Sequence, residues 1–137
     1  MTTTSTQIGD PSQLVLSKEV TFDQMLVFSG YPETNSVHTS REFATSLGLP
    51  NAVAQGLQTY AYMCEWLVSF FGADWFRGGR LAVSFLSIVL PGDGVAVRAS
   101  LAGTKETDDG TRVTLDIWCE NHRREKVAAG SATAVVR

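Results

Sequence analysis

The sequence has few charged residues, and their balance argues against two broad classes of protein. Only 18% of the 137 residues are charged, which argues against a disordered acidic or basic tail. The formal net charge is −3, which argues against a nucleic-acid-binding surface rich in Lys and Arg. Arg123, Arg124 and Lys126 form the only basic cluster along the sequence, and this cluster is typical of a solvated turn. We therefore expect no nucleic-acid partner.

Long apolar runs and recognisable metal motifs are missing as well. No stretch of about 18 apolar residues exists, so we expect no membrane span. The first six residues carry neither a basic nor an apolar region, so we expect no secretory signal. Cys64 and Cys119 lie in apolar segments, and their spacing matches no zinc or redox motif. We expect two buried, reduced thiols in a cytoplasmic protein that needs no metal or other cofactor.

The apolar residues that are present suffice for one core. Hydrophobic residues make up 44% of the chain and include seven Phe, three Trp and three Tyr. The length fits one domain. Residues 1–13 are expected to be a flexible N-terminal segment, because this stretch is rich in Thr, Ser, Gly and Pro. Residues 14–137 are expected to form the single domain.

The strongest periodic signal predicts a long helix over residues 53–71. Apolar residues recur there at intervals of three and four, at Ala54, Leu57, Ala61, Cys64, Val68 and Phe71. Further apolar residues widen this stripe nearly all the way round, so we expect the helix to be buried on most sides. Two shorter helices are predicted before it. One follows the capping box of Thr21 and Gln24 and ends at 27 or 28, and the other spans 40–46.

After residue 79 apolar residues recur at every second position instead of every three or four residues, which is typical of strands. Alternation predicts strands over 81–85, 95–101, 113–119 and 127–136, and a short strand begins near residue 14. The short turns between successive strands predict an antiparallel sheet. The expected fold is therefore α+β, with a long central helix wrapped by a curved antiparallel sheet. The open edge of such a sheet leads us to expect pairing with a second copy, as a homodimer.

The sequence has only two histidines, which limits the candidates for a catalytic histidine. His122 lies in a predicted hairpin turn, where we expect it to be exposed to solvent. His38 lies in the polar, irregular segment before the long helix, with Glu33 five residues earlier and Asn35 between them. A carboxylate and a His are suited to moving protons in one pocket. The spacing by itself is also compatible with a purely structural loop.

The segment 28–38 reads FSGYPETNSVH and resembles the signature S-G-D-x-N-P-x-H of the MaoC-like (R)-specific enoyl-thioester hydratases and dehydratases. Counted back from His38, Glu33 takes the place of the family's catalytic Asp, and Asn35 stays in register. Counted forward from the Ser-Gly pair, Tyr31 takes that place and two residues are inserted. We prefer the first alignment, because it keeps a carboxylate beside the His. Ser36 replaces the usual Pro.

Four further motifs follow in family order. Residues 43–49 match an A…G continuation, and AQGL at 54–57 resembles A-H-G-M/L, with Gln55 in place of the His. Residues 83–93 resemble V-x-F-x-x-P-V-x-P-G-D, and residues 120–132 resemble N-x-x-G-x-x-V-x-x-G-x-A. The resemblance covers about residues 14 to 136 and implies the hot-dog fold of this family.

The resemblance also implies a mechanism. Glu33 and His38 would hold one water as an acid–base pair, and Asn35 would fix the loop. The backbone N–H of Gly56 would meet the negative charge that develops on the thioester oxygen. The alternative for Gly56 is close helix packing, and the alternative for Asn35 is an ordinary turn residue.

The substrate implied is a 2-enoyl or 3-hydroxyacyl thioester of coenzyme A or of an acyl carrier protein. The residues expected to border the acyl group are Tyr31, Gln55, Tyr60, Met63 and Trp66. The aromatic residues and the methionine could instead be plain core. The altered signature favours a role in polyketide or secondary metabolism. Two other functions stay open, namely another hot-dog enzyme, such as a thioesterase or cyclase, and a non-catalytic subunit.

Overall fold

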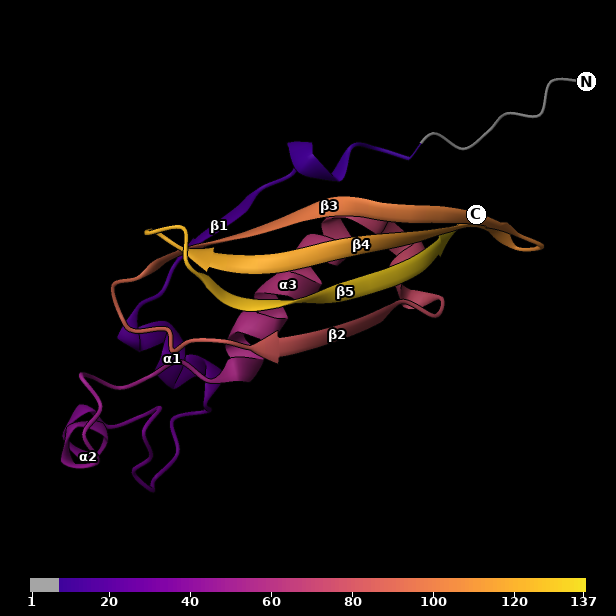
Figure 1. Cartoon of the computed structure of the whole chain (residues 1–137). Helices are drawn as coiled ribbons and strands as arrows, with labels where there is room; N and C mark the ends of the chain where they lie inside the picture. Colours follow the sequence, from indigo (N-terminus) through magenta and orange to yellow (C-terminus); the bar gives the residue numbers. More distant parts are fainter. Residues whose placement is uncertain (1–7) are drawn as a thin grey trace, which may run out of the picture.

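The computed structural model describes residues 8–137 and shows one curved antiparallel sheet wrapped over a long helix (Figure 1). The sheet has five strands in the order β1-β3-β4-β5-β2. The strands are β1 Leu16–Glu19, β2 Arg80–Phe85, β3 Gly94–Thr107, β4 Gly110–Asn121 and β5 Lys126–Val136. The helices are α1 Phe22–Phe28, α2 Arg41–Ser46 and α3 Gly56–Phe71, and the 3-10 turns are η1 Pro11–Gln13 and η2 Gly72–Phe76. The predicted α+β layout is confirmed.

The two short helices begin where their capping residues predict. The Thr21 hydroxyl accepts a hydrogen bond from the Gln24 N–H at 3.1 Å, and the Ser40 hydroxyl accepts one from the Phe43 N–H at 3.1 Å. Each bond satisfies a backbone donor that the first helical turn leaves free. The carbonyl oxygen of the Gln24 side chain accepts from the Tyr62 hydroxyl, so this side chain ties α1 to α3.

The helix α3 begins three residues later than predicted, because the chain before it is extended. The Val53 N–H donates to the Val37 carbonyl at 2.9 Å, and the Ala54 N–H donates to the Val89 carbonyl at 2.8 Å. These two bonds hold residues 53 and 54 between the loop of residues 29–40 and the segment that connects β2 to β3. The start of the helix is therefore fixed relative to the loop that carries His38.

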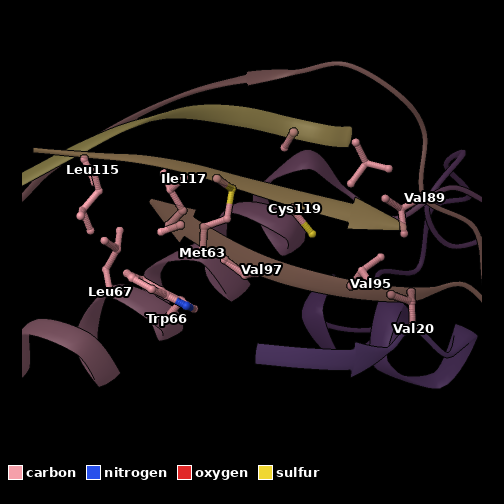
Figure 2. Close-up of a cluster of buried hydrophobic side chains, with 14 of the residues drawn as sticks. Val20, Met63, Trp66, Leu67, Val89, Val95, Val97, Leu115, Ile117 and Cys119 are labelled. Atoms are coloured by element: carbon pink, nitrogen blue, oxygen red, sulfur yellow. The ribbon is translucent and has the colours of Figure 1, made fainter. Parts of the chain in front are cut away.

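The core lies between α3 and the inner face of the sheet (Figure 2). Met63, Trp66 and Leu67 are fully buried on the helix, and Ile117 of β4 is among the strand residues that meet them. The Trp66 indole N–H donates to the Leu14 carbonyl at 2.9 Å, which satisfies its polar atom inside the core.

The expectation that α3 is buried on most sides is wrong for the single chain. Leu57 is 61% exposed and Val68 is 36% exposed, and Ala61 between them is exposed as well. Residues four and seven apart share one helix face, so these side chains form an apolar strip turned away from the sheet. The single sheet covers only the opposite face of α3 (Figure 1). In the single chain, the carboxylate of an Ala61→Asp variant would therefore be exposed to solvent and not buried in the core.

Residues 1–7 of the predicted flexible segment lie outside the described residues. The remainder includes η1, where the Asp10 carboxylate accepts from the Ser12 N–H at 3.0 Å. Partly buried Ile8 and Leu14 pack against the core on either side of this turn. The flexibility of residues 1–13 stays a prediction.

Both cysteines are free thiols; Cys119 is buried, whereas Cys64 is half-buried. Burial, with the Glu120 charge beside it, raises the pKa of the Cys119 thiol to about 12 from an ordinary value of 9.0. The unfolded chain therefore loses this proton first as the pH rises. The contribution of the thiol to stability is present below pH 9 and is lost between pH 9 and about pH 12.

We expect the stability of the wild-type protein, relative to a Cys119→Ala variant, to fall between about pH 8 and about pH 10.5. Urea unfolding of both proteins at the two pH values measures this difference, and other titrating groups cancel in the comparison. A difference that stays constant or grows with pH would contradict the burial of a neutral thiol.

Candidate active site

A short hydrogen-bonded turn holds His38 in place. The Ser36 hydroxyl accepts from the His38 N–H at 3.1 Å, and the Thr39 hydroxyl accepts from the Ser36 N–H at 3.1 Å. Such side-chain-to-backbone bonds stabilise turns that lack a proline. Ser36 therefore restrains the loop by hydrogen bonding, without the proline of the signature that this segment resembles.

The orientation of the imidazole is set by a backbone carbonyl. His38 Nδ1 lies 2.8 Å from the Val53 carbonyl oxygen, which can only accept, so Nδ1 carries the proton in this contact. The neutral ring then has its lone pair on Nε2. The side chain is half-buried, and Nε2 has the electron pair that a general base requires.

The N-terminus of α3 is left without a side-chain cap. Gln55 occupies the N-cap position, but its side-chain amide donates to the Ser29 hydroxyl at 2.8 Å instead of capping the helix. The first N–H groups of a helix have no partner inside the helix, and the dipole makes this end positive. An oxygen that develops negative charge could be stabilised by the N–H of Gly56.

The space around Gly56 is narrow. A Cβ atom at this position would lie 3.0 Å from the Phe85 ring at the end of β2. The Val53 carbonyl that orients His38 belongs to the segment leading directly into α3. The structure therefore brings His38, Gln55 and Gly56 to one end of the helix.

The other predicted loop residues are more exposed. Glu33 is exposed and forms no hydrogen bond or ion pair within residues 8–137 that would join it to His38. Asn35 is exposed and borders a hollow of about 540 Å³ together with Asn51. Tyr31 is exposed, with a left-handed backbone at φ 47°. The convergence of Glu33 and His38 on one water stays a prediction.

The predicted acyl-lining residues differ in their burial. Tyr60 is half-buried, whereas Met63 and Trp66 are fully buried in the core. The Trp66 ring also stacks on Phe70 at a centroid distance of 5.0 Å. A substrate could contact Met63 or Trp66 only if the core opened at this point, so their role in binding stays a prediction.

Sequence reasoning missed the polar pair Gln58 and Tyr62. Gln58 is only 3% exposed, and its amide donates to the Tyr62 hydroxyl at 2.8 Å. The Gln58 carbonyl oxygen is buried and has no hydrogen-bond partner. Both residues border a hollow of about 380 Å³ between α1 and α3. The signal in the sequence was a Gln in the first turn of a largely apolar helix.

Within residues 8–137 no group of three or more His, Cys, Asp or Glu side chains is arranged to hold a metal ion. None of the helices formed by these residues is long and apolar enough to span a bilayer.

The curved five-stranded sheet around a long helix defines the hot-dog class of protein. The chain belongs to the MaoC-like family, because the family model described as MaoC like domain matches residues 3–122. No protein of curated function matches the chain in sequence.

Solved structures share this fold at low identity. The (R)-hydratase from A. caviae involved in PHA biosynthesis is similar with a TM-score of 0.78 and 17% identity, over 98% of this chain and 100% of that chain. R-hydratase PhaJ1 from Pseudomonas aeruginosa has a TM-score of 0.74 and 16% identity, over 90% and 78%. The HadBC complex of Mycobacterium tuberculosis, a 3R-hydroxyacyl-ACP dehydratase, has a TM-score of 0.67 and 19% identity, over 95% and 98%. These similarities show the fold.

If the Gly56 N–H stabilises a thioester oxygen, Gly56→Ala should lower turnover of a 2-enoyl thioester by about tenfold or more, because the added methyl group would narrow the approach of that oxygen to the N–H. The added methyl group meets the Phe85 ring, which is exposed and can move, so the folded state should lose less than about 1 kcal/mol. Steady-state kinetics and urea unfolding measure the two effects, and Gly103→Ala on β3, where a Cβ atom would meet nothing within 4 Å, serves as a matched control. Undiminished turnover in Gly56→Ala would remove Gly56 from the mechanism.

Proposed function

We propose that the protein is an (R)-specific hydratase or dehydratase of 2-enoyl and 3-hydroxyacyl thioesters, carried by coenzyme A or an acyl carrier protein. The observation that carries this proposal is His38. Its Nδ1 is hydrogen-bonded to the carbonyl of Val53, three residues before the uncapped N-terminus of α3 at Gly56, and this leaves Nε2 free to act as a base. A proton acceptor beside unpaired helical N–H groups suits addition of water to an α,β-unsaturated thioester.

In the hydration direction, one member of the Glu33–His38 pair takes a proton from water, and the oxygen of that water bonds to C3. The electrons of the double bond move toward the thioester carbonyl, whose oxygen gains negative charge. The Gly56 N–H and the positive end of α3 stabilise this oxygen. A proton delivered to C2 by the other member completes the product, and dehydration is the same sequence in reverse.

Membership of the MaoC-like family supports this proposal, as do the activities of the structural neighbours, which include two R-hydratases and a 3R-hydroxyacyl-ACP dehydratase. The exposed position of Glu33, without a bond to His38, favours one alternative. A Glu that acts alone on water could hydrolyse the thioester instead, as in a thioesterase. The altered loop signature also leads us to propose a substrate from polyketide or secondary metabolism.

One assay separates these functions. Purified protein is given a short 2-enoyl thioester, the loss of the conjugated double bond is followed by absorbance, and free thiol is measured in parallel. We expect loss of the double bond with no thiol release, and a product whose 3-hydroxyl has the R configuration. Thiol release without hydration would establish a thioesterase, and no reaction of either kind would support a non-catalytic subunit.

We expect a homodimer in which the β2 edges and the apolar strip of α3 are covered. The strip exposes Leu57 and Val68, and Phe85 at the end of β2 is exposed beside it. Replacing Leu57 and Val68 together by Glu should yield a monomer, because paired apolar faces would then carry unpaired charges. Light scattering at micromolar concentration measures the mass. Leu101→Glu on β3 is the control, because Leu101 is also exposed but lies outside the proposed interface, and it should leave the mass unchanged. A wild-type protein of monomer mass would contradict the expectation.

A further inference from the structure

The hollow between α1 and α3 has walls of mixed polarity. Its volume is about 380 Å³, and Val27, Phe28, Gln58 and Tyr62 are among the residues that border it. Val27 and Phe28 are apolar and lie on the exposed side of α1, where they are 62% and 41% exposed. Sites for small organic ligands combine apolar walls with a few polar groups and have volumes of about 300–1,000 Å³. We call this space the α1–α3 hollow.

The α1–α3 hollow lies at the same end of α3 as the candidate active site. Phe28, on its wall, precedes Ser29, and the Ser29 hydroxyl accepts from the Gln55 amide at 2.8 Å. Gln58 follows Gly56 by two residues, which is a rise of about 3 Å along the helix axis. A ligand whose oxygen meets the Gly56 N–H could therefore extend into the hollow.

The Gln58 side chain brings an unused hydrogen-bond acceptor to this place. Its amide donates to the Tyr62 hydroxyl at 2.8 Å, and that hydroxyl donates in turn to the Gln24 side chain at 3.3 Å. A hydroxyl has one proton, so Tyr62 has none left for the Gln58 carbonyl oxygen. Within residues 8–137 no other group donates to this buried oxygen. Buried acceptors in folded proteins are nearly always paired, so a bound ligand is a natural source of the donor.

The charges at the rim of the hollow do not favour an anion. Lys18 borders the hollow, but its Nζ lies 2.9 Å from the Glu65 carboxylate, which compensates its charge. Asp23 also borders the hollow and adds a negative charge. A phosphate or carboxylate group would be repelled by Asp23 and would bring no proton to the Gln58 oxygen. The chemical group that matches the hollow is therefore neutral and carries an O–H or N–H.

We propose that the α1–α3 hollow binds the acyl chain of the substrate and that Gln58 selects chains with a hydroxyl group on C5; this inference deepens the proposed function and rests on it. The hydroxyl donates to the Gln58 oxygen, while Val27 and Phe28 contact the carbon chain. The oxygen is buried, so the hydroxyl reaches it as an exposed wall side chain such as Phe28 turns aside. The chain then needs no opening of the core around Met63 and Trp66.

The position of the hydroxyl follows from the chemistry of acyl thioesters. A 3-hydroxyacyl thioester that is lengthened by two carbons before its hydroxyl is removed carries that hydroxyl on C5. The reaction that supplies the substrate is therefore a two-carbon extension of a chain that has kept an earlier hydroxyl. A plain fatty acyl chain would leave the Gln58 oxygen unpaired in the complex, which costs binding free energy.

Substrates that differ only in this hydroxyl test the inference. We expect the wild-type protein to show a kcat/KM about tenfold higher for the 5-hydroxy-2-octenoyl thioester of pantetheine than for the 2-octenoyl thioester, the effect of one buried hydrogen bond. Gln58→Leu has a side chain of similar size and no acceptor. It should abolish the preference by lowering kcat/KM for the hydroxylated chain and raising it for the plain chain. Gln13→Leu, the same change in the exposed turn η1, should keep the preference.

Three results of this comparison would overturn the inference. The first is a wild-type preference below about twofold, because a hydrogen bond to a buried group gives more. The second is an equal loss for both substrates in Gln58→Leu, because Gln58 would then bind the pantetheine arm or serve only the fold. The third is an undiminished preference in Tyr62→Phe, which removes the hydroxyl that holds the Gln58 amide in place. Circular dichroism checks that each variant is folded.

Binding of unreactive analogues separates this inference from the proposed function. Saturated octanoyl amides, in which nitrogen replaces the sulfur of the pantetheine thioester, undergo neither hydration nor thioester hydrolysis. In calorimetry, the 5-hydroxy form should bind the wild-type protein about tenfold more tightly than the plain form, and Gln58→Leu should bind both equally. This result in a protein without turnover would support the inference and contradict the function. Turnover of 2-octenoyl thioester with no hydroxyl preference in kinetics or binding would overturn the inference and leave the function standing.

Discussion

His38→Ala is expected to reduce turnover of 2-enoyl or 3-hydroxyacyl thioesters by about 10²–10⁴-fold, which is the usual contribution of a general base. The Val53 carbonyl holds the proton on Nδ1 and leaves Nε2 as the reactive atom, and alanine has no group that could take its place. The side chain packs at the surface of the fold, so circular dichroism should show an unchanged structure. His122→Ala, in the exposed β4–β5 turn, is the matched control and should keep full activity.

Glu33→Gln should reduce turnover to a similar degree, and the double variant should lose little more than either single variant. Residues that act as one unit show this lack of additivity. Full activity in a folded His38→Ala protein would falsify the mechanism. If His38→Ala is inactive but Glu33→Gln is active, the carboxylate has been wrongly aligned and Tyr31 is the next residue to replace.

Trp66→Ala is expected to destabilise the protein by about 3–5 kcal/mol, the range for removing a large aromatic side chain from a core. The side chain is fully buried, stacks on Phe70 and donates to the Leu14 carbonyl. The variant leaves a cavity, and it leaves the Leu14 carbonyl without this donor. Urea unfolding measures the loss, and Phe76→Ala is a control, since Phe76 is 75% exposed and should change stability by less than about 0.5 kcal/mol.

Trp66→Phe separates the two roles considered for this residue. As a core residue, it should lose about 1–2 kcal/mol of stability with its hydrogen bond, and the KM for a short-chain thioester should not change. If Trp66 lines the acyl site, the variant should instead alter the KM for long-chain thioesters while stability stays near that of the wild type.

The elements were predictable because their signals are local. Apolar periods of about 3.6 and of two identified α3 and the strands β2 to β5, and Thr21 and Ser40 marked the starts of α1 and α2. The motifs around His38 and Gly56 pointed to one site, and in the structure both residues lie at the same end of α3. The start of α3 was misplaced, because the bonds of Val53 and Ala54 come from residues far away in the sequence.

The burial of α3 could not be predicted from its composition. Leu57, Ala61 and Val68 form as good an apolar stripe as the buried face does, and periodicity cannot tell a face covered by the sheet from one awaiting a partner. The reverse holds for Gln58 and Thr59, which are polar and yet buried. Which residues of α3 are buried depends on which helix face the sheet and α1 cover, and only the tertiary structure shows this.

By itself, the sequence determined the kinds of elements, their order and the family, because hydrophobic period, capping residues and short motifs are properties of neighbouring residues. Tertiary structure decided the proton position on His38, through the carbonyl of a residue 15 positions away. It also brought Arg77, Arg80 and Arg112 to one hollow, from the turn after η2, from β2 and from β4. Such sites depend on strand register and chain crossing, since contacts between distant segments form only when the sheet closes over the helix.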